Sequence, residues 1–310
     1  MSSPTLDVTA CVLSLNRPLY LCDAISSILA QTKLPNDIVI YDNGSQPDVF
    51  AATEDYFSMG VRWRGSDLTR SGFWNFRRAV AEAQSEYVLI MHDDDRLCVD
   101  FIEKQMNFLE KNKDVVVVSC NGYWLDEYGI QIGKKLFSDL SDEMYRCSGD
   151  VAMRYASDRC IPFSPAVYRT KVLCQIDISE EYDKGSDAVL FCDLADVGIV
   201  AYQSSPLYEC RIHGGQDSNY FAPEVMDRLE RFFWTRKTKN NEDKIRLHKL
   251  LVVQHTRHNL LRLLKSLGRG YSIRATLGEL SKFWDGIFSP LAAVKIIAKA
   301  VMKRIISIVK

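Results

Sequence analysis

The chain has 310 residues, of which 47% are hydrophobic and 25% are charged, and its formal net charge is −1. These values are those of an ordinary folded protein and exclude a disordered chain. The charge is unevenly spread, since residues 236–310 carry 17 Lys and Arg against 4 Asp and Glu, so we expect an acidic body with a basic tail.

The nine cysteines are scattered and never form a C-x-x-C pair, which predicts reduced thiols in a cytosolic protein. The N-terminus "MSSPTLDVTA" has neither a basic nor an apolar signal region, so we expect no signal peptide. No apolar stretch approaches the roughly 20 residues that span a bilayer. We therefore expect a cytoplasmic protein that does not cross a membrane.

The first 120 residues alternate apolar, β-branched runs with segments of helical spacing. The expected strands are residues 8–15, 37–43, 87–91 and 115–120, and the expected helices are residues 18–32, 71–84 and 100–112. Continuous apolar strands separated by helices predict a mostly parallel sheet covered on both faces, in an α/β fold. Ligands bind beyond the carboxyl ends of the strands in such sheets.

The rest of the chain gives a weaker pattern. We expect a helix over residues 186–198, a strand over 199–203, a loop over 211–218, and helical structure from 222 onwards. The last twenty residues, 291–310, place lysines at intervals of four among aliphatic residues. This spacing predicts a basic amphipathic helix at the C-terminus.

Three adjacent aspartates, Asp93, Asp94 and Asp95, follow the apolar run "YVLIM" directly. Adjacent carboxylates at the end of a buried strand repel one another unless a positive group lies close by. A bound Mg²⁺ or Mn²⁺ would supply that charge, since both prefer oxygen ligands. A solvated acidic turn is the alternative that the triplet alone leaves open.

Polar residues also follow the other expected strands, in "SLNRP" (14–18) and "YDNGSQPD" (41–48), and precede a helix in "RSGFWN" (70–75). Each segment by itself fits a plain turn or the start of a helix, for which Pro18 is well placed. Together they predict polar groups gathered at one edge of the sheet.

These motifs, in this order and spacing, make residues 7–218 similar to the inverting glycosyltransferases of family 2, which have a GT-A fold. The resemblance is carried by "VLSLNRPLYLCDAISSILAQT", "DIVIYDNGSQPD" and "SGFWNFRRAVAEAQSEYVLIMHDDD", and more weakly by "GSDAVLFCDLADVG" and "CRIHGGQDS". It implies transfer of a sugar from a nucleoside-diphosphate donor, with a UDP-sugar expected, and a divalent metal, Mn²⁺ or Mg²⁺, as cofactor.

The resemblance also implies roles for individual residues. The residues expected to bind the donor are Leu15, Asn16, Arg17, Asp42, Ser45, Arg70, Gly72, Asn75, Asp93 and Arg211. The expected metal ligands are Asp94, Asp95 and His213. The family often has an Asp where this chain has His92, so the register of its D-x-D motif is ambiguous: Asp94 aligns best with the metal ligand, whereas Asp93 and Asp95 satisfy the spacing.

Asp187 aligns with the second acid of the family's Glu-Asp pair, which makes it the expected general base. This chain has Ser186 where the family commonly has Glu. An acidic residue near the start of a helix also has a simpler explanation, because the helix dipole stabilises it there.

The basic tail suggests contact with a membrane surface, since anionic lipid attracts lysines spaced among aliphatic residues. A C-terminal helix packed on the body is the alternative. We expect no nucleic-acid partner, because the residues between the lysines of 291–310 are mostly aliphatic and are not the stacking aromatics that nucleic-acid grooves use. By resemblance to enzymes that extend lipid-linked O-antigen or capsule units, we expect a glycan or lipid-linked acceptor, and a peripheral position on the inner face of the cytoplasmic membrane.

We expect a GT-A domain over residues 1–220 and a helical extension over 221–310. The nucleotide-sugar half would cover about 7–120 and the acceptor half 121–220. Two alternatives remain open: a nucleotidyltransferase of related fold, and a non-catalytic protein that binds sugar or lipid. The first would need a glycine-rich phosphate loop after the first strand, and "SLNRPLY" has no glycine.

Overall fold

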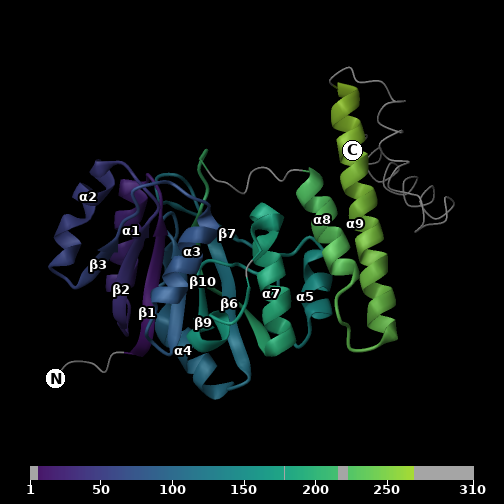
Figure 1. Cartoon of the computed structure of the whole chain (residues 1–310), viewed down its shortest axis with the longest axis horizontal. Helices are drawn as coiled ribbons and strands as arrows, with labels where there is room; N and C mark the ends of the chain where they lie inside the picture. Colours follow the sequence, from purple (N-terminus) through teal and green to yellow (C-terminus); the bar gives the residue numbers. More distant parts are fainter. Residues whose placement is uncertain (1–5, 178, 216–222, 269–310) are drawn as a thin grey trace.

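The computed structural model describes residues 6–177, 179–215 and 223–268, and it has a central sheet with helices on both faces (Figure 1). The strands are β1 (Leu6–Ser14), β2 (Pro35–Asp42), β3 (Val61–Arg64), β4 (Tyr87–His92), β5 (Arg96–Leu97), β6 (Val115–Leu125), β7 (Gln131–Lys135), β8 (Glu143–Tyr145), β9 (Ala166–Arg169) and β10 (Ile199–Arg211). The helices are α1 (Pro18–Leu29), α2 (Pro47–Phe57), α3 (Gly72–Glu82), α4 (Phe101–Lys111), α5 (Ser148–Tyr155), α6 (Thr170–Leu173), a 3₁₀ turn η1 (Glu180–Gly185), α7 (Ser186–Val197), α8 (Pro223–Trp234) and α9 (Asn241–Gly268).

The ten strands form one sheet in the order β3-β2-β1-β4-β9-β6-β10-β5, with β7 added to β6 and β8 to β10. Strands β3, β2, β1 and β4 are parallel, and so are β6 and β10, whereas β9 runs antiparallel between β4 and β6. The expected α/β sheet flanked by helices is confirmed. Its carboxyl edge carries the ends of β1, β2 and β4 side by side.

Alternate residues of the central strands pack into two hydrophobic cores, one on each face of the sheet. In β4, for example, Val88 and Ile90 lie in the core under α3, α5 and α7. Leu89 and Met91 lie in the core under α1, α2 and α4. Helices cover both faces of the sheet. The ends of the strands are therefore the places where a ligand can reach the sheet.

The elements with strong periodicity lie close to their expected positions, and the weaker ones were missed. The sequence analysis gave no helix for α2, which begins with Pro47 at its first turn and buries only Val49 and Thr53. A helix that buries so few residues has no apolar stripe for a sequence pattern to show. Strands β3, β5, β7, β8 and β9 and helices α5 and α6 were also missed, and β6 and β10 are several residues longer than expected.

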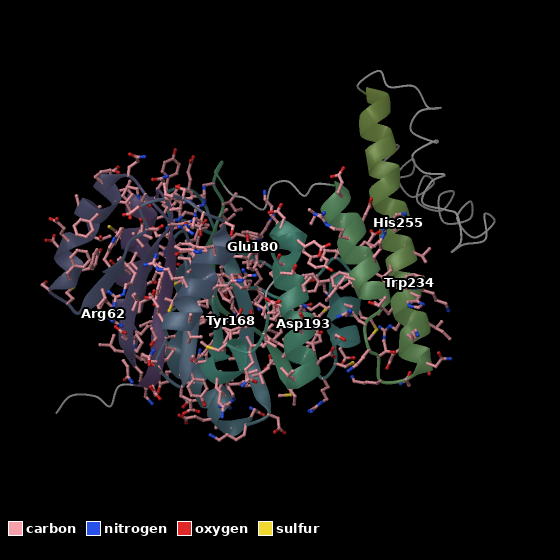
Figure 2. The ribbon with its side chains drawn as sticks, viewed as in Figure 1. Arg62, Tyr168, Glu180, Asp193, Trp234 and His255 are labelled. Atoms are coloured by element: carbon pink, nitrogen blue, oxygen red, sulfur yellow. The ribbon has the colours of Figure 1, made fainter. Side chains whose placement is uncertain are left out.

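The C-terminal helices α8 and α9 pack against each other and on the body of the fold, as the helical pattern after residue 222 predicted. Trp234 of α8 stacks on His248 of α9 with ring centres 3.8 Å apart, and Figure 2 shows Trp234 and His255 on this helix pair. The linker between the two helices meets α5, where Gly149 donates its N–H to the Lys237 carbonyl at 2.7 Å. The boundary at residue 220 stays a prediction.

Two other predictions concern the C-terminal region. The basic helix expected over residues 291–310 lies outside the described residues. Within the part of the chain that the structure describes, no helix is both long enough and apolar enough to span a bilayer.

Two buried glutamines allow a test of the core around α4. Gln105 is fully buried, and neither of its amide atoms has a hydrogen-bond partner among the described residues. Gln31 is also buried, but it donates to the Ser27 and Cys98 carbonyls and accepts from the Ile102 N–H. An unpaired buried amide is destabilising, whereas a paired one is not.

We therefore expect Gln105→Met to raise the free energy of unfolding by about 1 kcal/mol, and Gln31→Met to lower it by about 2 kcal/mol. Urea denaturation of the two variants beside the wild type measures both changes. A loss of stability in Gln105→Met as large as that in Gln31→Met would contradict this account.

Candidate functional site

The three aspartates follow β4 and lie buried at the carboxyl edge of the sheet, with 1%, 8% and 4% of their surfaces exposed in chain order. Asp93 is held by the end of β1, because its N–H donates to the Leu13 carbonyl and its Oδ2 accepts from the Leu15 N–H at 2.9 Å. The strand pairing of β1 with β4 therefore fixes where the triplet begins.

A cationic side chain already lies among these carboxylates. Arg17, which follows β1, donates from Nη1 to Asp93 Oδ1 at 2.7 Å and to Asp94 Oδ2 at 3.1 Å. The positive group that the sequence requires near the triplet is thus supplied in part by the chain itself. The donor contact expected of Arg17 stays a prediction.

The three carboxyls differ in their electrostatics. Burial raises the pKa of Asp93 to about 6, although Arg17 opposes the shift. Burial and the neighbouring Asp94 charge raise the pKa of Asp95. For Asp94, burial also acts upward, but His92, Arg17 and His213 outweigh it and lower the pKa. Asp94 is therefore the member of the triplet that holds its negative charge most readily.

Three side chains at this edge are arranged as metal ligands could be. His92, Asp94 and Asp95 each offer one ligand atom, and these atoms lie within 4.8 Å of one another. Asp93 is outside this group, and His213, whose Nε2 lies 3.0 Å from Asp94 Oδ2, contacts it through a hydrogen bond. Two carboxylates suit Mg²⁺ or Mn²⁺. The sequence analysis did not select His92, although it directly precedes the triplet.

A second group with metal-binding residue types lies on the C-terminal helices and consists of Asp227, Glu230 and His255. There, His255 Nδ1 and Glu230 Oε2 are hydrogen-bonded at 2.5 Å, which is shorter than two ligands of one ion usually approach. We interpret this group as a polar link between α8 and α9.

The ends of β1 and β2 are joined by hydrogen bonds. Asp42 Oδ2 accepts the N–H groups of Gly44 and Ser45, which is the turn predicted for "DNGS". The Asn16 N–H donates to Ser45 Oγ at 2.8 Å, and Asn16 Oδ1 accepts from the Gln46 N–H. The expected donor-binding residues of these two segments are therefore close neighbours.

Two acceptor atoms at this edge are buried without a partner among the described residues. They are Oδ1 of Asp42 and Oδ1 of Asn75. The other atoms of these side chains are engaged, since Asn75 Nδ2 donates to the Tyr41 carbonyl at 2.6 Å. A buried acceptor without a donor is unfavourable, so its presence points to a ligand that brings N–H or O–H groups.

The segment before α3 closes the other side of this site. The backbone of Arg70 exchanges two hydrogen bonds with the Asn43 side chain, and its guanidinium lies 4.6 Å from the ring centre of Trp74. Ser71 caps α3 by accepting from the Trp74 N–H, and Gly72 is the first residue of the helix. Trp74 was not among the predicted site residues.

Asp187 lies in the first turn of α7. Because α7 leads directly into the start of β10, its first turn is the end of the helix that lies away from the start of that strand. Its Oδ1 accepts the Ala188 N–H at 2.7 Å, and Tyr155 Oη lies 3.5 Å from its Oδ2. Burial raises its pKa to about 6, although these two donors act in the opposite direction. Ser186 is buried, and its hydroxyl donates to the Ser179 carbonyl. This hydrogen bond stabilises the turn before the helix.

Asp187 and the aspartate triplet lie on either side of the segment between α5 and β9. Tyr155 Oη is 3.3 Å from the Ile161 carbonyl, and two residues later the Phe163 ring lies 5.8 Å from the His92 ring. Among the described residues, no hydrogen bond or ion pair joins Asp187 to the triplet.

Arg211 is the last residue of β10 and is almost fully buried, whereas we expected it in a loop. Its Nε donates to the Asp94 carbonyl at 2.9 Å, its Nη2 donates to Asp23, and its guanidinium lies 4.5 Å from the Tyr20 ring centre. Its backbone N–H donates to Asp95 Oδ1. These contacts hold the triplet in place, and the expected contact of Arg211 with a donor stays a prediction.

Beside His213 the surface has a hollow with a volume of about 440 Å³. The hollow is lined by Asp126, Glu127, Tyr128, Ile132, Ile212, His213 and Gly214. It lies on the α1 side of the triplet, since the Tyr20 and His213 rings are in contact, and thus on the side opposite Asp187.

Comparisons with known proteins agree with this geometry. The family model described as "Glycosyl transferase family 2" matches residues 9–175, more than half of the chain. The protein named "Putative glycosyltransferase EpsE" of Bacillus subtilis (strain 168) is 22% identical over 186 residues, which are 57% of this chain and 66% of EpsE. The alignment thus spans slightly less than two thirds of that relative.

Solved structures of S. aureus TarS, residues 1–349, have the same fold. The structure in complex with UDP superposes with a TM-score of 0.62 at 15% identity, covering 87% of this chain and 76% of TarS. The structure in complex with UDP-GlcNAc has the same TM-score and identity and covers 87% and 77%. At this identity the likeness shows the fold alone.

The pairing of Arg17 with the triplet can be tested by stability. Arg17→Met leaves two buried carboxylates without their cation, and we expect it to lower the free energy of unfolding by about 3 kcal/mol. Arg62→Met removes a more exposed arginine that pairs with Asp37, and we expect a loss of at most about 1 kcal/mol. Denaturation in metal-free buffer measures both, and equal losses would contradict the role given to Arg17.

Proposed function

This chain belongs to glycosyl transferase family 2, and on that premise we propose that it transfers a sugar from a nucleoside-diphosphate donor to a hydroxyl group of an acceptor. The observation that carries the proposal is the meeting of two features at one edge of the sheet. The His92, Asp94 and Asp95 group could hold a metal ion with a diphosphate, and the unpaired acceptors of Asp42 and Asn75 could hold the rest of a nucleotide.

The nucleotide is proposed to be UDP. Asp42 Oδ1 needs a hydrogen-bond donor, which the N3–H of uracil supplies, whereas the unprotonated N3 of cytosine is itself an acceptor. Leu15, Asn16 and Ser45 would line this side of the donor, and Arg70, Gly72 and Asn75 the ribose and diphosphate side. The complexes of TarS with UDP and UDP-GlcNAc support this choice by analogy of fold.

Asp94, Asp95 and His213 are proposed to hold Mn²⁺ or Mg²⁺, and the arrangement of side chains adds His92 as a further candidate ligand. A divalent ion bound there would neutralise negative charge on the diphosphate. Arg17 and His213, which already contact Asp94, add positive charge or hydrogen-bond donors beside the same group. Asp93 would act through Arg17 and the Leu15 N–H, which it positions.

Asp187 is proposed as the general base. Its carboxylate would take the proton from the acceptor hydroxyl while the hydroxyl oxygen attacks the anomeric carbon, and the bond to the diphosphate breaks on the opposite face. One displacement of this kind inverts the anomeric configuration. Support comes from the separation of Asp187 from the triplet: Asp187 lies near Tyr155 and the Ile161 end of the segment after α5, whereas His92 contacts Phe163 further along it, so the two groups could act on different sides of a bound sugar.

The acceptor is proposed to be a glycan or lipid-linked glycan in cell-surface polysaccharide synthesis, with the protein peripheral to the inner face of the cytoplasmic membrane. The supporting observations are the excess of basic residues after residue 236 and the resemblance in sequence. A binding protein without catalysis is the second candidate, favoured by Ser186 where the family commonly has Glu.

The donor site is tested by thermal unfolding with UDP, CDP and GDP, each with and without Mn²⁺. At a hundred times its dissociation constant, a ligand of the folded state adds about 2.7 kcal/mol, so we expect a clear rise in Tm with UDP and Mn²⁺. The rise should be absent in Asp94→Ala and reduced in Asp42→Ala. A Tm that does not change with any of the nucleotides would contradict the proposal.

The role of Asp187 as base is tested in a transfer assay with UDP-sugars, in which the release of UDP is followed. We expect Asp187→Asn to abolish transfer and to leave the Tm rise with UDP and Mn²⁺ intact. Because a base must be deprotonated, wild-type kcat/KM should fall about tenfold per unit as the pH drops below about 6. Full activity of Asp187→Asn, or a rate independent of pH between 5 and 7, would exclude this role.

A further inference from the structure

The hydroxyl group of Tyr155 lies between two acceptors. One is Asp187 Oδ2 at 3.5 Å and the other is the Ile161 carbonyl oxygen at 3.3 Å. A phenol has a single proton to donate, so it can serve one of these acceptors at a time. Tyr155 is partly buried, and its choice between them depends on which acceptor is the stronger.

The charge of Asp187 decides that choice. A carboxylate is a stronger acceptor than a carbonyl, since a hydrogen bond to a charged group is the stronger kind. Once Asp187 has gained a proton, its own O–H can donate to the Tyr155 oxygen, and the phenol proton is free to turn to Ile161. Both states of the acid are then hydrogen-bonded, with a rotation of one hydroxyl group between them.

We propose that Tyr155 is a positioning residue for Asp187, donating to the carboxylate before proton transfer and to the Ile161 carbonyl after it. This inference rests on the proposed function in one respect only, that Asp187 is the base. The other groups that face Asp187 are the Ala188 N–H from its own helix, Cys160 from the segment after α5, and Tyr168 from β9. The hydroxyl of Tyr168 is 3.1 Å from the Phe163 carbonyl.

The C-terminal helices hold Tyr155 in place. Its ring lies against Phe233 of α8, with ring centres 6.0 Å apart, and its carbonyl accepts from Gln254 Nε2 of α9 at 3.1 Å. The other end of α5 is attached to the α8–α9 linker through Gly149, where an added Cβ would lie 2.4 Å from the Lys237 carbonyl oxygen. The C-terminal helix pair therefore helps to fix the position of Tyr155 beside Asp187.

The test is a pH titration of the Asp187 carboxyl carbon by NMR, in protein labelled with ¹³C at aspartate Cγ and assigned with Asp187→Asn. A hydrogen bond to the charged form lowers the pKa of an acid. Tyr155→Phe keeps the ring that packs on Phe233, and we expect it to raise the Asp187 midpoint by about one pH unit. The matched control, Tyr168→Phe, should leave the midpoint unchanged.

An unchanged midpoint in Tyr155→Phe would overturn the proposal, and so would an equal shift in Tyr168→Phe. Gln254→Leu removes the contact of α9 with Tyr155 and so tests whether the C-terminal helices hold Tyr155 in place. If the Asp187 midpoint does not rise in that variant, this role of the helices is overturned and the role of Tyr155 is not. If Tyr155→Phe does not fold, the titration is made with wild-type protein labelled with ¹³C at tyrosine Cζ. One tyrosine resonance should then shift with the same midpoint as Asp187, and the proposal would be overturned if no tyrosine resonance did so.

This experiment is independent of the proposed function, because it needs neither donor nor acceptor. A shift of the midpoint together with full activity of Asp187→Asn would leave the hydrogen bond established and remove the role of Asp187 as base. An unchanged midpoint together with loss of transfer in Asp187→Asn would remove the role of Tyr155 and leave the base in place.

Discussion

The burial of three adjacent carboxylates at the end of β4 is the constraint on which the site depends. Asp93, Asp94 and Asp95 are each more than nine-tenths buried, which is unfavourable without compensation. The compensation comes from segments far apart in the chain: the guanidinium of Arg17 after β1 pairs with Asp93, and the backbone N–H of Arg211 at the end of β10 donates to Asp95. Because these partners must reach the triplet, β1 and β10 have to end beside it, and the edge of the sheet is shaped accordingly.

The layered fold determines where a ligand can bind and how it can lie along this edge of the sheet. Helices cover both faces of the sheet, so the strand ends are left as the place for a ligand. The unpaired acceptors of Asp42 and Asn75 lie at the end of β2 and in α3, the metal-binding residue types lie at and after the end of β4, and Asp187 lies in the first turn of α7. A donor laid across the edge in this order would have its leaving group and the base on opposite sides of the transferred sugar, as a single displacement needs.

The C-terminal helices are more closely joined to the body than their place after the family-matched region indicates. The close contacts at Gly149 and Gly185, where Leu229 of α8 lies against the turn before α7, leave no room for an ordinary side chain. Substituting either glycine would therefore displace α5 or α7, and with it Tyr155 or Asp187. This packing gives the helix pair a physical route by which it can influence Asp187, the proposed base.

The sequence by itself determined the α/β fold, the positions of its strongly periodic elements and the edge at which polar groups gather, because periodicity and strand-end chemistry are local properties. It did not show α2, whose apolar face is too small, or the pairing of β9 between β4 and β6. Nor could it decide which cation meets which aspartate. Arg17 and Asp93 are far apart in sequence, and Arg211 and Asp94 are farther still. Such pairings, the buried acceptors of Asp42 and Asn75, and the contact of Tyr155 with Asp187 arise only when the sheet is assembled, since tertiary packing alone decides which distant groups share a low-dielectric space.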